Sequence, residues 1–529
     1  MTVYILGIAC AILLCVFAEK FSDKFGMPAL ISFMFVGMLF GSDGILKISF
    51  DNFELAENIC AIALVFIMFY GGFNTKWSVA KPVAVKAITL STLGVLMTAG
   101  ITTVICRFIF GLALQESFLI GAVLSSTDAA SVFAILRKKN LNLRDGAASV
   151  LEVESGSNDP VAYMLTMIAV SVMRSGKTES VAGLIFLQIV FGVLIGILMA
   201  QLSLFVMTKT RLISEGLDMI FMIAMVLMCF GVTSIINGNA YLSLYLFGIV
   251  IGNSRIRNKQ MLIPFFDGVT SLSQILIFSL IGLLSFPSQM PQIAPLALAI
   301  VVALTIVARP LTVFVLMAPF KCSMRQCLLI SWAGLRGASS CVFAIMAVTA
   351  GITMQRDLFH IVFMVSLFSV AIQGTLLPYI AQKLDMVDNN SDVRKTFNDY
   401  QEETSLQLMR MYIPKGHNWE NKKIKDVVMP TGALALMIKR GKESIITKGN
   451  TLIRAGDNII LSVPPYTPSE NEQLQEHVIT KKDAWCNKMI GELELDIDVL
   501  IAMVLRDGES IIPDGKTMLY ENDVVVLYR

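Results

Sequence analysis

The chain has 529 residues, of which 55% are hydrophobic and only 16% are charged. This composition is typical of a polytopic α-helical membrane protein and excludes an ordinary soluble enzyme. The formal net charge of +2 gives no reason to expect a nucleic-acid partner.

Hydrophobic runs separated by short polar turns predict about thirteen membrane-spanning helices, each near the length of roughly 20 residues that crosses a bilayer. The first run has no basic region before it and no small-residue cleavage site, so we expect a retained span rather than a signal peptide. The predicted spans are residues 3–19, 28–46, 55–73, 83–110, 115–136, 147–173, 181–208, 217–236, 239–252, 264–285, 292–319, 324–349 and 357–382.

The positive charges of the loops predict the orientation. Loops that follow odd-numbered spans carry sixteen Lys and Arg residues, and the loops and ends on the other side carry five. Because basic loops stay in the cytoplasm, the N-terminus is expected on the outer side of the membrane and the C-terminal region on the cytoplasmic side.

A polar cluster interrupts the sixth predicted span. Glu154, Ser155, Asn158 and Asp159 are spaced so that a helix places all four on one face. Carboxylate, amide and hydroxyl oxygens suit a hard monovalent cation, and carboxylates inside a membrane are costly unless they have a function. A structural polar network between helices is the alternative, and it accounts less well for four such residues together.

Two other spans are predicted to be broken helices. The sequence STDAAS surrounds Thr127 and Asp128, and GLRGASS surrounds Arg336. Such small-residue segments at corresponding positions are typical of inverted-repeat transporters, in which interrupted helices point toward an ion. We expect Arg336 to pair with Glu154, which leaves Asp159 as the exchanging carboxylate. Arg309 is interpreted as a residue near a span end, where its charge can reach water.

These motifs resemble the NhaP-type cation/proton antiporters, which are related to the eukaryotic sodium/proton exchangers. The similarity rests on ESGSNDP, STDAASVF and GLRGASS and covers roughly residues 1–382. It implies a 13-span homodimer with inverted repeats, surrounded by lipid, that works by alternating access. It also implies roles for site residues: Asp159 binds cation or proton, Glu154, Ser155 and Thr127 line the site, Asn158 organises it, Asp128 lies beside it, and Arg336 balances Glu154.

The resemblance also suggests which ion is carried. Ala129 follows the Thr-Asp pair where many sodium-specific members have proline, so K+ is favoured over Na+. Since a proton and a cation cannot both neutralise Asp159, binding of one should expel the other. Because the pair is Asn158-Asp159 rather than two aspartates, one carboxylate cycles, and we expect one-for-one electroneutral exchange without a cofactor. A gated cation channel with the same tail is the alternative function. A membrane-embedded enzyme is disfavoured, because no activated nucleophile accompanies the carboxylates.

The chain after the last span changes character. Residues 383–404 are polar and predict a linker, and the remainder contains two copies of a small α+β unit, at 405–466 and 467–529. Residues 419–463 align with 485–529 without a gap, and fifteen of the 45 positions are identical.

The first copy resembles the C-terminal ligand-binding half of TrkA-type potassium regulators, and the second is a more diverged copy. The sequence contains no GxGxxG motif, which argues against a Rossmann nucleotide-binding half. Two roles are equally expected for this tail. It binds a small effector, such as a cyclic dinucleotide, or it is a purely structural dimerisation domain.

Overall fold

The computed structural model separates the chain into two compact units, Met1–Ser391 and Asp392–Arg529. The structure describes residues 2–25, 28–48, 50–138, 141, 143–175, 181–209, 216–254, 256, 259–352, 354–387, 407–429, 433–440, 443–463, 474–481, 483–493, 500–506 and 509–528.

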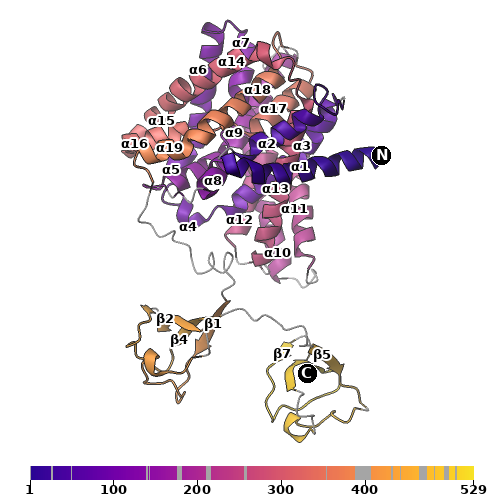
Figure 1. Ribbon diagram of the computed structural model, residues 1–529, viewed down its shortest axis with the longest axis vertical. Coiled ribbons are helices and arrows are strands. Elements are labelled where there is room, and N and C mark those ends of the chain that lie inside the picture. Colours follow the sequence, from indigo (N-terminus) through magenta and orange to yellow (C-terminus); the bar gives the residue numbers. More distant parts are fainter. Residues whose placement is uncertain are drawn as a thin grey trace. The chain divides into compact units, whose positions relative to one another are not determined.

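The first unit is built from helices (Figure 1), as the hydrophobic runs predict. They are α1 (Thr2–Phe25), α2 (Ala29–Phe40), α3 (Phe53–Asn74), α4 (Trp77–Ala80), α5 (Ala84–Thr89), α6 (Val95–Phe108), α7 (Leu114–Val123), α8 (Ala129–Lys138), α9 (Ala147–Ser175), α10 (Val181–Lys209), α11 (Asp218–Ile235), α12 (Ala240–Gly252), α13 (Lys259–Leu284), α14 (Met290–Ala303), α15 (Arg309–Met317), α16 (Met324–Trp332), α17 (Ala338–Thr349), α18 (Leu358–Phe368) and α19 (Thr375–Lys383).

Seven helical segments within the described ranges are long and apolar enough to cross a membrane. Four shorter apolar helices, α2, α7, α12 and α17, lie among them. By length and composition these helices fit a helical membrane fold, whereas the full number of spans stays a prediction.

Three of the long segments contain a π-helical turn. These turns are η1 (Leu90–Gly94) between α5 and α6, η2 (Leu304–Ala308) between α14 and α15, and η4 (Ser369–Gly374) between α18 and α19. A π-turn adds one residue to the helix and so rotates the residues that follow it. The residue immediately after η2 is Arg309.

Two segments are interrupted near their middle. Residues 124–128 separate α7 from α8, and residues 333–337 separate α16 from α17. The two interruptions contact each other, because the backbone N–H of Asp128 donates to the carbonyl of Leu335 at 2.9 Å. The interruptions leave backbone groups without helical hydrogen bonds inside the unit. They also place the adjoining ends of α7, α8, α16 and α17 beside α9.

Small residues allow the helices of this unit to approach closely. A Cβ atom on Gly72 of α3 would lie 2.2 Å from the Tyr245 carbonyl of α12, and one on Gly248 would lie 2.2 Å from the Phe69 carbonyl. Gly37 of α2 and Gly282 of α13 make the equivalent close contact. Helices in lipid associate through such contacts, since apolar burial alone provides little driving force there.

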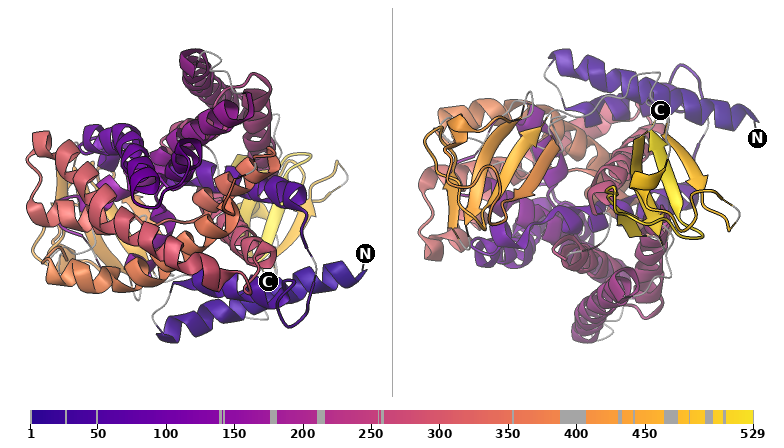
Figure 2. Two further views of the ribbon diagram at one scale, coloured as in Figure 1. Left: turned by 90° about the horizontal axis from the view of Figure 1, so that it is seen from above. Right: turned by 90° about the horizontal axis from the view of Figure 1, so that it is seen from below.

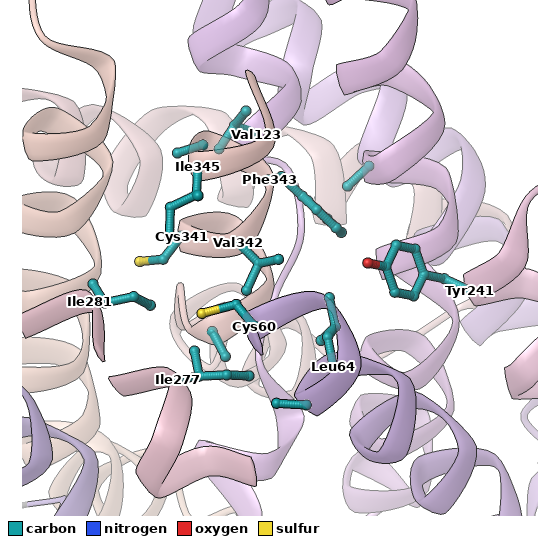
Figure 3. Packing of buried hydrophobic residues seen from close by; sticks show 14 of the residues in the cluster. Cys60, Leu64, Val123, Tyr241, Ile277, Ile281, Cys341, Val342, Phe343 and Ile345 are labelled. Atoms are coloured by element: carbon teal, nitrogen blue, oxygen red, sulfur yellow. The ribbon is translucent and has the colours of Figure 1, made fainter. Parts of the chain in front are cut away.

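The core of the first unit surrounds α17. Figure 3 shows Cys341, Val342, Phe343 and Ile345 of this helix among buried side chains from α3, α7, α12 and α13. Helix α9 runs through the interior and contacts α7, α12 and α17. Seen from above and below, α1 and α10 lie on opposite sides of the unit (Figure 2). The polar segment of α9 is therefore enclosed by other helices.

The second unit contains two antiparallel four-stranded sheets with the same strand order, β1-β4-β2-β3 and β5-β8-β6-β7. Their strands are β1 (Gln407–Tyr412), β2 (Leu434–Arg440), β3 (Glu443–Ile446) and β4 (Asn458–Val463), and then β5 (Leu474–Val478), β6 (Leu500–Arg506), β7 (Glu509–Ile511) and β8 (Val524–Tyr528). The helical turns described in this unit are the short 3₁₀ turns Ile424–Asp426 and Ile490–Glu492.

The same ion pair recurs in both sheets. Arg440 donates to both carboxylate oxygens of Asp457 at 2.7 Å, and Arg506 donates to those of Asp523 at 2.8 and 2.7 Å. Burial raises the pKa of Asp457, but the hydrogen bonds from Arg440 and the Arg454 backbone outweigh it, so that the pKa is lowered. Each sheet therefore has a buried carboxylate, Asp457 or Asp523, that is paired with an arginine and stays ionised at neutral pH.

Candidate functional site

Helix α9 carries the predicted polar face into the interior. The exposed fractions of Glu154, Ser155, Asn158 and Asp159 are 0%, 6%, 0% and 5%. Pro160, within the same helix, has no N–H to donate to the carbonyl one turn earlier, and its own carbonyl accepts a hydrogen bond from Asn239 at 2.7 Å. The predicted face is therefore buried among polar partners.

Asp159 lies against both interruptions. The hydroxyl of Ser126, in the interruption between α7 and α8, donates to Oδ1 of Asp159. The Oγ atom of Ser126 is also 3.0 Å from Oγ of Ser339, in the first turn of α17. Three segments that are far apart in the sequence thus meet at one carboxylate.

A second group of oxygens lies one turn away on α9. The Asn158 amide nitrogen donates to Oγ1 of Thr127 at 2.5 Å, and this oxygen is 2.9 Å from Oγ of Ser155. The amide oxygen of Asn158 is buried and has no hydrogen-bond partner among the described residues. A buried unpaired acceptor is costly, so this oxygen is available to a bound cation or water.

Asp128 faces the second interruption. Its carboxylate accepts from the backbone N–H of Ser131 at 3.2 Å and from the Ser131 hydroxyl at 2.5 Å, which caps the start of α8. A Cβ atom on Gly337 would lie only 2.0 Å from Oδ2 of Asp128. Asp128 therefore lies where the two interruptions cross and contacts both of them.

The predicted pairing of Glu154 with Arg336 is wrong. Nη2 of Arg309 donates to Oε1 and Oε2 of Glu154 at 2.6 and 2.8 Å, so Arg309, not Arg336, forms the ion pair. The interpretation of Arg309 as a residue near a span end is also wrong, because Arg309 lies eleven residues before the end of the apolar segment Met290–Phe320 and is only 3% exposed. The π-turn η2 directly before Arg309 sets which way this residue faces.

Arg336 instead binds the backbone of the first interruption. Its Nη1 atom donates to the carbonyl of Ser126 at 2.5 Å, and its backbone N–H donates to Oγ of Ser369 at 3.1 Å. Arg309, Arg336, Ser369 and Gln373 line a small cavity between η2, the second interruption and η4. An arginine in this position satisfies a carbonyl that the broken helix leaves unpaired.

Three residues of this constellation escaped the sequence prediction. Ser126 and Ser339 lie inside the two small-residue motifs, but a serine there is as easily a helix-packing residue. Arg309 lies well inside the predicted span 292–319, and this depth was the available signal, since a charged side chain at midspan requires a partner.

Comparison with known proteins identifies the family of the helical unit. Residues 9–383 match the sodium/hydrogen exchanger family, over its transmembrane domain. The chain belongs to the sodium/hydrogen exchanger family. The prediction of a cation/proton antiporter rather than an enzyme is therefore confirmed, and no comparison supports the channel alternative.

Relatives of the exchanger extend over both units. The K(+)/H(+) antiporter NhaP of Alkalimonas amylolytica is 30% identical over 522 residues, which cover 96% of this chain and 90% of that protein. The K(+)/H(+) antiporter NhaP2 of Shewanella oneidensis is 31% identical over 449 residues, 84% of this chain and 78% of that protein. Residues 408–466 and 474–528 each match the TrkA-C domain, which confirms the predicted character of the tail.

The fold of the exchanger is also that of a solved structure. The sodium proton antiporter MjNhaP1 from Methanocaldococcus jannaschii, determined at pH 8, aligns with a TM-score of 0.64 at 21% identity. The alignment covers 72% of this chain and 99% of that one. It establishes the architecture of the helical unit.

Proposed function

We propose that this exchanger carries K+ in one direction and H+ in the other across the cytoplasmic membrane, with Asp159 as the carboxylate that binds either ion. The observation that carries this proposal is the position of Asp159, which is 5% exposed and lies where α9 meets both interrupted segments. A buried carboxylate is much less costly to move through a membrane when it is neutralised. Proton and cation therefore compete for it, and one carboxylate gives one-for-one electroneutral exchange.

The neighbours of Asp159 divide the work. Ser155, Thr127 and Asn158 supply oxygens, of which the unpartnered amide oxygen of Asn158 is the most available. Asp128 holds the interruptions together from beside the site. Both oxygens of Glu154 accept from Arg309, so Glu154 supports the site through its charge rather than as a cation ligand.

K+ is favoured over Na+ by two observations. The relatives that span most of the chain are named K(+)/H(+) antiporters, and Ala129 follows the Thr-Asp pair. The test uses proteoliposomes in which each alkali cation in turn drives a change of internal pH. We expect K+ to drive exchange and Asp159→Asn to abolish it, while Asp51→Asn, at an exposed carboxylate of a loop, leaves it intact. Exchange at the normal rate in the Asp159 variant contradicts the assignment.

The proposal also includes the architecture that the hydrophobic runs, the loop charges and the family resemblance predict. The exchanger has thirteen spans in inverted repeats, with the N-terminus outside and the tail in the bacterial cytoplasm, and it works as a homodimer in the lipid of the inner membrane. Its domains are the transporter at 1–382, a linker at 383–404, and regulatory repeats at 405–466 and 467–529. Cysteine labelling from either side of sealed vesicles tests the orientation.

The two TrkA-C domains are proposed to bind a small cytoplasmic effector, with a cyclic dinucleotide as the first candidate. Their separate cores, each closed by an Arg-Asp pair, support folded binding units rather than a flexible tail. Deletion of residues 400–529 is expected to abolish the response of transport to the effector. An unchanged response to cyclic dinucleotides, with and without the tail, leaves the structural dimerisation role.

A further inference from the structure

Two serine hydroxyls connect Asp159 to the second interrupted segment. Ser126 donates to Oδ1 of Asp159, and its Oγ atom is 3.0 Å from that of Ser339. The exposed fractions of Ser126 and Ser339 are 0% and 4%. The contact joins residues 213 positions apart, so it depends on the crossing of the two interruptions rather than on local structure.

The chemistry of the hydroxyl group gives this contact a direction. A serine hydroxyl has one proton to donate, and an ionised carboxylate can only accept. Since Ser126 gives its proton to Asp159, the hydrogen bond between the serines requires Ser339 as the donor. The resulting chain runs from Ser339 to Ser126 to Asp159. Hydrogen bonds to charged acceptors are strong, and donors arranged in series strengthen one another.

The second interrupted segment also fixes the position of Ser126. Arg336, in the interruption, donates to the Ser126 carbonyl at 2.5 Å. Ser339 follows on the first turn of α17, whose N-terminus carries the positive end of the helix dipole. Ser126 is therefore held by its backbone and its side chain toward the same segment.

We propose that Ser339 is a positioning residue that sets the cation affinity of the exchanger by stabilising the empty, ionised Asp159 through Ser126. This inference rests on the proposed role of Asp159. A cation that approaches Oδ1 must compete with the Ser126 hydroxyl for the same oxygen. The chain thus makes the empty site more stable and the affinity for cation lower than the carboxylate alone would give.

The chain also couples ion binding to the second interrupted segment. When a cation or proton neutralises Asp159, Ser126 loses its charged acceptor, and the bond from Ser339 weakens with it. The start of α17 is therefore held more firmly to α9 in the empty state than in the occupied state.

The test compares two adjacent serines of α17 in the full chain, reconstituted into proteoliposomes at alkaline pH so that protons compete little with K+. Ser339→Ala removes the donor of the chain and is expected to lower the apparent KM for K+ by about three- to tenfold, the factor of one hydrogen bond. Ser340→Ala is the matched control. It also removes a fully buried hydroxyl, but one that has no partner among the described residues. It should leave KM unchanged, and Ser339→Thr, which keeps the hydroxyl, should restore the original KM.

A second comparison tests the route through Ser126. In a Ser126→Ala background, the additional Ser339→Ala change should have a clearly smaller effect on KM than in the original chain, because the link through Ser126 is already broken. An unchanged or raised KM in Ser339→Ala overturns the inference, as does an additive effect in the double variant. A purely structural role for Ser339 would reduce yield or rate and would not lower KM. If Asp159→Asn abolishes exchange while Ser339→Ala behaves as the original chain, the inference fails and the proposed function stands.

Discussion

Replacing Arg309 by methionine should leave Glu154 as a buried, unpaired charge. The side chains of the pair are only 4% and 0% exposed, and the guanidinium reaches both carboxylate oxygens. Removal of one partner of such a pair costs roughly 3–5 kcal/mol, whereas replacement of both partners by neutral groups costs far less. Glu154→Gln should therefore recover most of the stability that Arg309→Met loses.

The same experiment on Arg336 separates the observed pairing from the one that the sequence predicts. Arg336→Met loses a bond to the Ser126 carbonyl, and Glu154→Gln does nothing to repair that loss. The assay is the temperature at which the detergent-solubilised full chain loses its monodisperse peak in size-exclusion chromatography. Rescue of Arg336→Met by Glu154→Gln, together with no rescue of Arg309→Met, would refute the pairing seen in the structure.

Two further predictions concern helix packing and the tail. Gly72→Ala should lower the same melting temperature, by an amount that corresponds to about 1–3 kcal/mol of overpacking, because its Cβ atom would lie 2.2 Å from the Tyr245 carbonyl. Gly71→Ala is the control, with nothing within 4 Å of its Cβ atom, and an equal loss in both variants would contradict the close approach of α3 and α12. In the tail, the pKa of Asp457 is lower in the folded sheet than in the unfolded chain, where it is about 4. The pair with Arg440 therefore stabilises the sheet at pH values above the unfolded pKa. This stabilisation is lost as the pH falls through the folded pKa. Calorimetry of the full chain should therefore show Arg440→Met destabilised near pH 7 and closer to the original chain at low pH, and a difference that does not change with pH would contradict this account.

Local spacing was enough to predict the polar face of α9. Ser155 and Asp159 are four residues apart, and the helix brings both to the interior. The small residues around Thr127 and Arg336 likewise predicted two interrupted segments, because such residues allow the backbone to leave the helix at low cost.

The partners across the site could not be predicted in this way. Periodicity says which face a residue occupies on its own helix, not which residue of another helix it meets. Arg309 reaches Glu154 after a π-turn that shifts the phase of its helix, and Ser339 reaches Ser126 only because the two interruptions cross. Both contacts depend on tertiary packing and appear only when the whole unit is assembled.

The three π-turns predict where alignments of this sequence with its relatives should contain single-residue gaps. A π-turn is equivalent to a single inserted residue that the helix absorbs without a loop. Within the first unit, η2 directly precedes Arg309, and η4 contains Ser369 and Gln373 of the cavity beside it. A homologue without one of these insertions would present a different residue to the same neighbours. Single-residue gaps inside apolar helices should therefore mark branches of the family in which the buried arginine has changed its position in the sequence.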